Sequence, residues 1–194
     1  QYRDMQLSVD SGGIEVARTA DRMHELARRM TSARAWGIEA HLLTPAEVVE
    51  LVPFVNEEVI LGGFYSPTVS VVDSLEAGTT MRREAVETVG CQVFANTEVL
   101  DIETSEGEGG VTTVRSVITD KGTIQADHVV IACGVWSNRI ANMAGAAIPL
   151  VPTVHQMADV GPVDILAETN NEIGYPIVRD MDTLCYERQS AGSM

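Results

Sequence analysis

His155 is one of four histidines in this chain, and histidine is the residue type best suited to move a proton near neutral pH. An imidazole ordinarily titrates near a pKa of ~6.5, so a histidine can take a proton from an ammonium group close to neutral pH. His155 stands between Val154 and Gln156. This strand-like setting also suits a histidine that is hydrogen-bonded inside a core. The residue by itself leaves both interpretations open.

A second candidate lies where the apolar run Val129–Ile131 leads into Ala132, Cys133 and Gly134, with Trp136 two residues later. A continuous apolar run bounded by turn residues predicts a strand that is covered on both faces. The glycine at its carboxyl end has no Cβ, so another molecule can approach the backbone closely. Because ligands of open α/β sheets bind outside the carboxyl ends of the strands, we expect these residues to contact a ligand.

Each residue of this second segment also has a simpler interpretation. Cys133 beside an apolar run is typical of a small buried hydrophobic residue. Gly134 also suits an ordinary turn, and Trp136 also suits packing against the start of a helix. The residue types leave these alternatives open.

The helices that position these candidates have clear start and stop signals. Thr44-Pro45-Ala46-Glu47 places a hydroxyl at the N-cap, proline at N1 and glutamate at N3. Asp73 begins a second segment of this type. Gly37 ends a run with apolar residues at three- and four-residue spacing. The predicted helices cover residues 19–36, 44–51, 73–90 and 137–145.

Short apolar runs between glycines and prolines predict the strands. Those after residue 97 form an antiparallel meander, which precedes the buried strand. The fold class is therefore α+β (mixed α/β), with one or two α/β strands rather than a regular βαβ series. The predicted strands cover residues 13–17, 39–43, 60–65, 91–94, 97–103, 111–119, 123–125 and 127–132, with further strand-like runs after 149.

Composition excludes several classes of function. The chain has 13 Lys and Arg against 28 Asp and Glu, a net charge of −15, which argues against nucleic acid and anionic membranes as partners. Its three cysteines, Cys91, Cys133 and Cys185, form no CxxC pair. We therefore expect neither a disulfide framework nor a metal site, and a reducing, cytoplasmic setting. No apolar stretch approaches the length of a membrane span, and no signal peptide opens the chain.

The sequence lacks a self-sufficient catalytic motif. It has no GxGxxG fingerprint, no phosphate-binding Walker loop, no HExxH and no GxSxG. The chain begins at Gln1 rather than Met and ends at Met194 directly after a strand-like run. We therefore expect it to be an internal piece of a longer protein.

Several segments together resemble one family. The sequence resembles the FAD-dependent amine oxidoreductases, which include D-amino-acid, glycine, sarcosine and dimethylglycine oxidases. It is most similar to the dimethylglycine oxidase and sarcosine dehydrogenase branch. Two departures are Ser74, where the family usually has proline, and Cys185, where it usually has tyrosine. The resemblance rests on segments 13–17, 63–67 with Asp73, 96–100, 132–136, 149–156 and 179–188.

The resemblance implies an arrangement of domains. It assigns residues 1–70 to a substrate domain with an antiparallel sheet. Residues 71–148 then supply a helix, a β-meander and one buried strand of an FAD-binding, Rossmann-like domain, and residues 149–194 return to the substrate domain. It also implies that the backbone of Val99 meets the adenine ring, and that Ala132, Cys133, Gly134 and Trp136 lie against the dinucleotide.

The resemblance further implies an activity. FAD would accept a hydride from the carbon next to nitrogen in a secondary or tertiary amine such as dimethylglycine or sarcosine. His155 would keep the amine unprotonated, and Tyr186 would orient the substrate or bind its carboxylate. Alternate strand residues face opposite sides, so the order Cys185-Tyr186 decides which of the two faces the pocket. Relatives of this branch often carry a folate-binding aminomethyltransferase region downstream.

Three alternatives remain. One is that the chain is a catalytically silent substrate-binding piece that needs an absent Rossmann half. A colourless purified protein would favour this alternative. Another is that the chain is a structural or regulatory flavoprotein relic, in which Cys185 marks lost activity. Within the enzyme class, a D-amino-acid or glycerol-3-phosphate type of flavoprotein is the runner-up.

Overall fold

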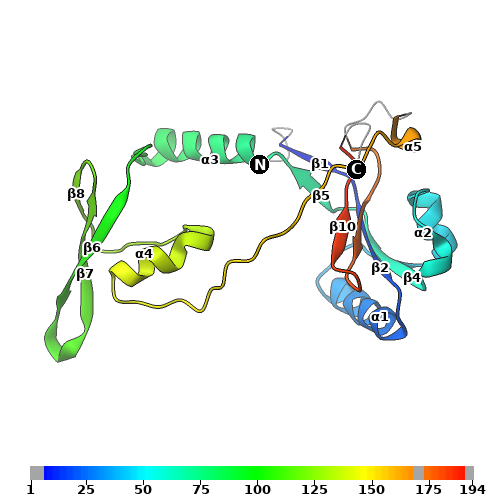
Figure 1. Ribbon diagram of the computed structural model, residues 1–194, viewed down its shortest axis with the longest axis horizontal. Helices are drawn as coiled ribbons and strands as arrows, with labels where there is room; N and C mark the ends of the chain where they lie inside the picture. The colour runs from blue at the N-terminus through cyan, green and yellow to red at the C-terminus, as the bar shows by residue number, and fades with distance from the viewer. Residues whose placement is uncertain (1–6, 168–172, 191–194) are drawn as a thin grey trace. The chain divides into compact units, whose positions relative to one another are not determined.

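A computed structural model describes residues 7–167 and 173–190 of this protein. The chain forms two compact units (Figure 1). The first contains residues 1–84 and 157–194, and the second residues 85–156. The domain roles expected for residues 1–70, 71–148 and 149–194 stay a prediction, and each unit is described by itself.

The first unit is built on a five-stranded sheet with strand order β10-β9-β2-β4-β3. Strand β2 runs parallel to β9, and all the other neighbours are antiparallel. A separate two-stranded sheet pairs β1 with β5. The strands are β1 (Ser8–Asp10), β2 (Gly13–Ala17), β3 (His41–Leu43), β4 (Gly62–Ser66), β5 (Ser70–Val72), β9 (Ile177–Asp180) and β10 (Cys185–Glu187).

Helix α1 (Ala20–Ala35) and helix α2 (Pro45–Leu51) cover opposite faces of the large sheet. A Cβ at Gly62 would meet Met23 of α1, whereas a Cβ at Gly63 would meet Val48 of α2. Adjacent residues of a strand point to opposite faces, so these two glycines let each helix approach β4 from its own side. On the α2 side lies the core, made of Ile14, Val16, Val48, Val52, Ile60 and Val178.

The helix start signals are confirmed in this unit. The Thr44 hydroxyl accepts from the Glu47 N–H, and the Glu47 carboxylate accepts from the Thr44 N–H, which completes a capping box. Thr19 caps α1 by accepting from the Arg22 N–H. Helix α3 (Ser74–Val89) begins at Asp73, whose Oδ1 accepts from two backbone N–H groups of the first turn. A short helix, α5 (Asp164–Ala167), and a 3-10 turn over Glu57–Val59 complete the unit.

The second unit contains the predicted antiparallel meander, which is confirmed. Strand β7 (Thr112–Thr119) lies between β6 (Val99–Glu106) and β8 (Gly122–Gln125), and a turn over Glu108–Gly110 joins β6 to β7. Helix α4 (Ser137–Met143) packs against β6 and follows a 3-10 turn, η4 (Gly134–Trp136).

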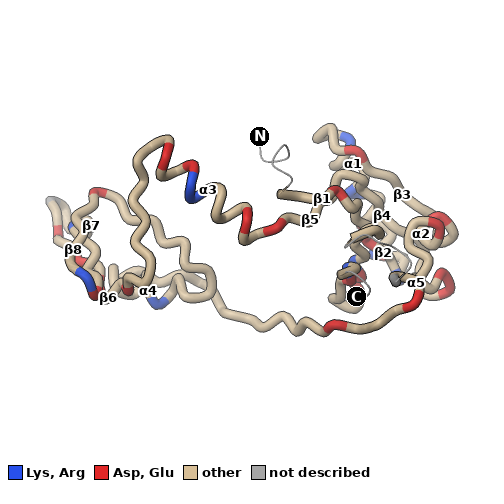
Figure 2. Tube along the Cα trace, turned by 90° about the horizontal axis from the view of Figure 1, so that it is seen from above, with Lys and Arg blue, Asp and Glu red and all other residues tan. Residues whose placement is uncertain are grey.

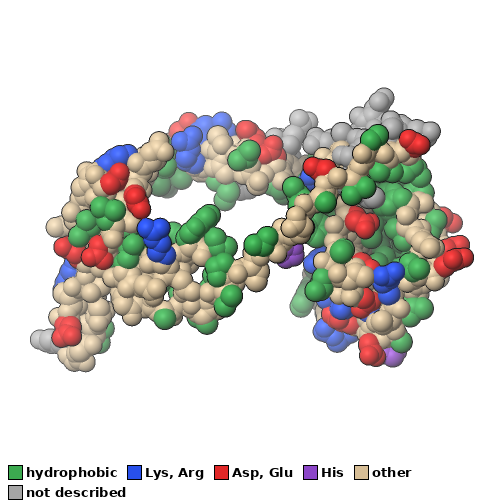
Figure 3. All heavy atoms as spheres, in the orientation of Figure 1, with side chains coloured by type: hydrophobic (Ala, Val, Ile, Leu, Met, Phe, Trp, Pro, Cys, Tyr) green, Lys and Arg blue, Asp and Glu red, His purple; other side chains and the backbone are tan. Residues whose placement is uncertain are grey.

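Two predicted strands are absent from the described structure. Residues 127–132 and 91–94 form neither helix nor strand, and Val130 is 88% exposed. The apolar pattern predicted burial, but a covered strand needs a neighbouring strand for its N–H and C=O groups. The described meander stops at Gln125, and no described strand pairs with these segments. Large hydrophobic side chains are therefore exposed in these segments, among them Phe94 and Val130. Figure 3 shows hydrophobic side chains on the visible surface of the protein.

Charged residues are distributed along both units of the protein. Acidic residues occur along both units, with basic residues interspersed in α1 and α3 (Figure 2). Among the residues that the structure describes, no helix has both the length and the apolar character required to cross a membrane.

Candidate functional site

Strands β9 and β10 form a hairpin that carries Tyr186. Residues 179–188, one of the segments on which the resemblance rests, are not one continuous strand, because residues 181–184 form a turn. Oδ1 of Asp180 accepts from the N–H groups of Asp182 (3.0 Å) and Thr183 (3.2 Å). An aspartate that binds the backbone two residues ahead is a turn-forming group, and Leu184 completes the turn with a φ of 59°.

The register of the hairpin places Tyr186 and Cys185 on opposite faces of the sheet. Tyr186 lies opposite Arg179, which in turn lies opposite Glu15 of β2. Directly opposite residues share a face, so these three side chains project on the α1 side. Cys185 lies opposite Asp180, and therefore on the other side. Tyr186 is 64% exposed, so the residue is accessible to a ligand.

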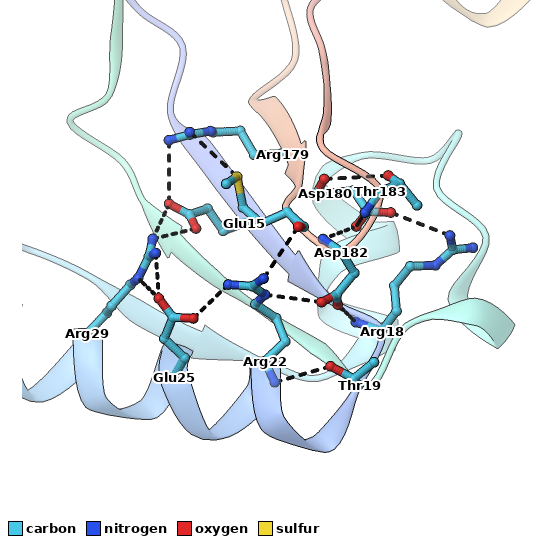
Figure 4. A network of polar contacts seen from close by, with 11 residues as sticks. Glu15, Arg18, Thr19, Arg22, Glu25, Arg29, Arg179, Asp180, Asp182 and Thr183 are labelled. Carbon is cyan, nitrogen blue, oxygen red and sulfur yellow. Dashed lines mark hydrogen bonds and ion pairs between the residues drawn. The ribbon is translucent and has the colours of Figure 1, made fainter. Parts of the chain in front are cut away.

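Next to Tyr186, six charged residues form what we name the ion-pair chain. Figure 4 shows it running from the hairpin turn along α1, across to β2 and back to β9. Positive and negative side chains alternate along it, with atoms 3.2, 2.6, 2.7, 2.6 and 3.6 Å apart in turn. In order, its members are Asp182, Arg22, Glu25, Arg29, Glu15 and Arg179.

The contacts of the ion-pair chain favour its charged state. The backbone N–H of Arg18 and, after it, the Arg22 guanidinium lower the pKa of Asp182. A hydrogen bond from Arg29 lowers the pKa of Glu25, and the same bond raises the pKa of Arg29. Three carboxylates thus face three guanidinium groups, and the α1 side of the sheet is charged but locally balanced.

The predicted cofactor residues lie on neighbouring elements of the second unit. Val99 is the first residue of β6 and is half-buried. Helix α4, which packs on β6, follows directly after Gly134 and Trp136, and its Arg139 lies 3.6 Å from Glu98. The structure therefore brings the element of Val99 beside the element that continues from residues 134–136.

The segment Ala132–Trp136 is exposed. Cys133 is exposed, so the structure contradicts the simpler interpretation of a buried hydrophobic residue. Trp136 is 68% exposed, which contradicts packing against the helix start. Gly134 has a φ of 54°, and a Cβ there would have nothing within 4 Å. This backbone is open to a closely approaching molecule, while its role as a cofactor site stays a prediction.

His155 is exposed and lies in a segment without helix or strand. The alternative of a hydrogen-bonded core histidine is therefore not supported. His155 belongs to the second unit and Tyr186 to the first. Their catalytic roles both stay predictions.

Sequence reasoning missed the ion-pair chain. The spacing Arg22-x-x-Glu25-x-x-x-Arg29 is a signal for pairs on one helix face. The partners Glu15 and Asp182 come from distant parts of the sequence, and only the fold reveals them. Among residues 7–167 and 173–190, no group of His, Cys, Asp or Glu side chains is arranged to hold a metal ion.

Three curated relatives are similar to nearly the whole chain. Sarcosine dehydrogenase of Mus musculus, a mitochondrial protein, is 34% identical over 93% of this chain. The mitochondrial pyruvate dehydrogenase phosphatase regulatory subunit of Mus musculus is 28% identical over 95%. Mitochondrial dimethylglycine dehydrogenase of Rattus norvegicus is 26% identical over 92%. The chain spans about a fifth of the length of these relatives, covering 19%, 20% and 20% of them.

A solved structure agrees in fold. L-proline dehydrogenase from P. horikoshii superposes with a TM-score of 0.76 at 24% identity, over 96% of this chain and 48% of that one. The family described as FAD dependent oxidoreductase matches residues 4–193. This chain belongs to the FAD-dependent oxidoreductase family.

Proposed function

We propose that this chain is part of an FAD-dependent enzyme that oxidises the C–N bond of a secondary or tertiary amine. N-methylated glycines such as sarcosine and dimethylglycine are the leading substrates. The observation that carries the proposal is the similarity to mouse sarcosine dehydrogenase over almost the full chain. The two predicted catalytic side chains, His155 and Tyr186, are both accessible to a ligand.

The residues proposed to hold FAD suit a dinucleotide. The exposed backbone at Ala132–Gly134 and the open space over Gly134 admit a closely packed group. Val99 would add backbone contact from β6. FAD, when bound, supplies the acceptor for a hydride.

The proposed role of this chain is to deprotonate and orient the amine before it is oxidised. An ammonium has no lone pair to expel the hydride from the neighbouring carbon, so the amine must first lose a proton. His155 is the proposed base. Tyr186 is proposed to orient the substrate from the α1 side of the sheet, where the charge is balanced locally by the ion-pair chain. The resulting iminium then takes up water and splits into an aldehyde and a shorter amine.

Steady-state turnover tests this proposal. The full reading frame that contains this chain is expressed, its bound flavin is quantified, and it is offered sarcosine, dimethylglycine, a D-amino acid and glycerol 3-phosphate. We expect bound FAD and turnover of the N-methylated glycines. Turnover of only the D-amino acid or only glycerol 3-phosphate would instead establish the runner-up substrate class.

A second candidate is a regulatory role without turnover. The similarity to the mouse regulatory subunit favours it. A purified full-length protein that carries FAD and oxidises none of the four substrates would support this candidate. A colourless protein would support a silent substrate-binding role.

Two further parts of the proposal concern the surroundings of the enzyme. A folate-binding aminomethyltransferase region in the same polypeptide would accept the one-carbon product, and the full reading frame tests for it. A cytoplasmic setting follows from the cysteine pattern, and cell fractionation tests it.

A further inference from the structure

The turn of the β9–β10 hairpin is attached to the start of α1 through one carboxylate. Oδ2 of Asp182 accepts from the backbone N–H of Arg18 at 2.9 Å, and Oδ1 accepts from Nε of Arg22 at 3.2 Å. Arg22 Nη2 also donates to the carbonyl of Met181 at 3.4 Å. The Asp182 side chain is only 17% exposed, so these contacts are partly shielded from water. Charge-assisted hydrogen bonds of this kind are stronger than neutral ones.

The hairpin is also attached to the β2–α1 region through strand β9. The ion-pair chain that starts at Asp182 passes along α1 and returns through Glu15 to Arg179 of β9 (Figure 4). Glu15 is itself clamped by Arg29 Nη1 at 2.8 and 2.6 Å. Both the turn and the strand opposite Tyr186 are therefore fixed to the β2–α1 region.

The position of Tyr186 follows from how the hairpin is held. Strand β10 has three residues and lies at the edge of the sheet, with β9 as its partner. The ring is 64% exposed, and the stacked and edge-on aromatic contacts of the described residues do not include it. The direction of the phenol is thus set by the geometry of the hairpin.

We propose that Asp182 is a positioning residue, which fixes the β9–β10 hairpin to the β2–α1 junction and thereby directs Tyr186 toward the substrate. The second half of this statement rests on the proposed function. The first half concerns the hairpin alone and holds whatever the substrate is.

The test compares three forms of the FAD-loaded full-length protein: wild type, Asp182→Asn and Asp182→Ala. Asparagine keeps the size of the side chain and one accepting oxygen but turns an NH₂ group toward another donor, whereas alanine removes both acceptors. Glu50→Gln and Glu50→Ala are the matched controls. Glu50 is an exposed carboxylate on α2 in the same unit, away from the ion-pair chain.

The first readout is hydrogen exchange of peptides that cover Arg18 and residues 181–187. We expect exchange to accelerate by about tenfold in Asp182→Ala, less in Asp182→Asn, and not at all in the Glu50 variants. This readout needs no turnover, so it decides the attachment of the hairpin even in a protein that oxidises no amine. Unchanged exchange in both Asp182 variants would overturn the proposal.

The second readout is kcat/KM for the amine. Misplacement of a substrate-orienting group by about 1 Å costs up to ~100-fold in rate. We expect kcat/KM for the amine to fall by about tenfold in Asp182→Ala and partly recover in Asp182→Asn, with flavin content unchanged. Faster hairpin exchange with unchanged kcat/KM would overturn the positioning role. A wild-type protein without amine turnover would instead contradict the proposed function and, with it, the directing of Tyr186.

Discussion

Tyr186 lies directly opposite Arg179 in the antiparallel pair of β9 and β10, so the two side chains share the α1 side of the sheet with Glu15. Cys185, its neighbour in sequence, faces the other side. The phenol of Tyr186 therefore lies on this charged face, and the thiol of Cys185 does not.

Replacing Tyr186 tests which of the two residues serves the substrate. Tyr186→Phe removes one hydroxyl, and kcat/KM for the amine should fall by about two- to tenfold, because one neutral hydrogen bond contributes roughly 0.5–1.5 kcal/mol. Cys185→Ser, on the opposite face, is the control and should leave kcat/KM unchanged. A loss in Cys185→Ser with none in Tyr186→Phe would reverse the assignment.

Replacing His155 tests the proposed base. In His155→Asn, kcat/KM should fall by about 100-fold, the usual order of a general base. The variant should also lose the acid limb of the wild-type pH profile, because asparagine cannot take up a proton as a base does. His41, an exposed histidine on β3, supplies the control variant His41→Asn. A His155→Asn enzyme with a wild-type pH profile would exclude this role.

Gly134 and Gly37 form a matched pair for the cofactor site. Both have positive φ, 54° and 69°, and at neither would a Cβ meet another atom within 4 Å. Alanine at either position should therefore destabilise the protein by a similar amount, about 1–2 kcal/mol. Only Gly134→Ala should also weaken FAD binding, measured as the flavin retained after dialysis. Equal flavin retention in the two variants would argue against contact at Gly134.

Gly63 and Gly78 test the packing of the large sheet. A Cβ at Gly63 would lie 3.0 Å from both Ile14 Cγ2 and Val48 Cγ2, whereas Gly78 of α3 has open space around it. Gly63→Ala should lower the free energy of unfolding by about 1–3 kcal/mol through overpacking. Gly78→Ala should raise it by about 0.5–1 kcal/mol, because alanine favours a helix. Urea denaturation measures both, and a stabilised Gly63→Ala would contradict the described core.

Acid should weaken the contacts by which Asp182 attaches the hairpin turn to the start of α1. The pKa of Asp182 is lowered below its ordinary 3.8 by the Arg18 N–H and the Arg22 guanidinium. A carboxyl whose pKa is lower in the folded state stabilises the fold above the ordinary value and loses that contribution as the pH falls through the lowered one. Wild type should therefore be more stable than Asp182→Asn at pH 7, and the difference should shrink well below pH 3.8. A difference that grows with acid would contradict this.

The sequence predicts correctly those features in which one short segment contains all the interacting groups. The capping box at Thr44 and the meander over residues 99–125 are such cases. The buried strand over 127–132 was predicted from apolar content alone, yet a covered strand needs neighbours that local pattern does not specify. In the ion-pair chain, the pairs within α1 have a local signal in their spacing, but the partnership of Asp182 with Arg22 depends on the pairing of β2 with β9.

Anaerobic mixing of the flavin-loaded full-length protein with sarcosine or dimethylglycine is the most direct test of the central claim. The account predicts that the absorbance of oxidised flavin disappears on mixing, and that His155→Asn slows this change about 100-fold while retaining its flavin. Flavin that stays oxidised with both amines would contradict it.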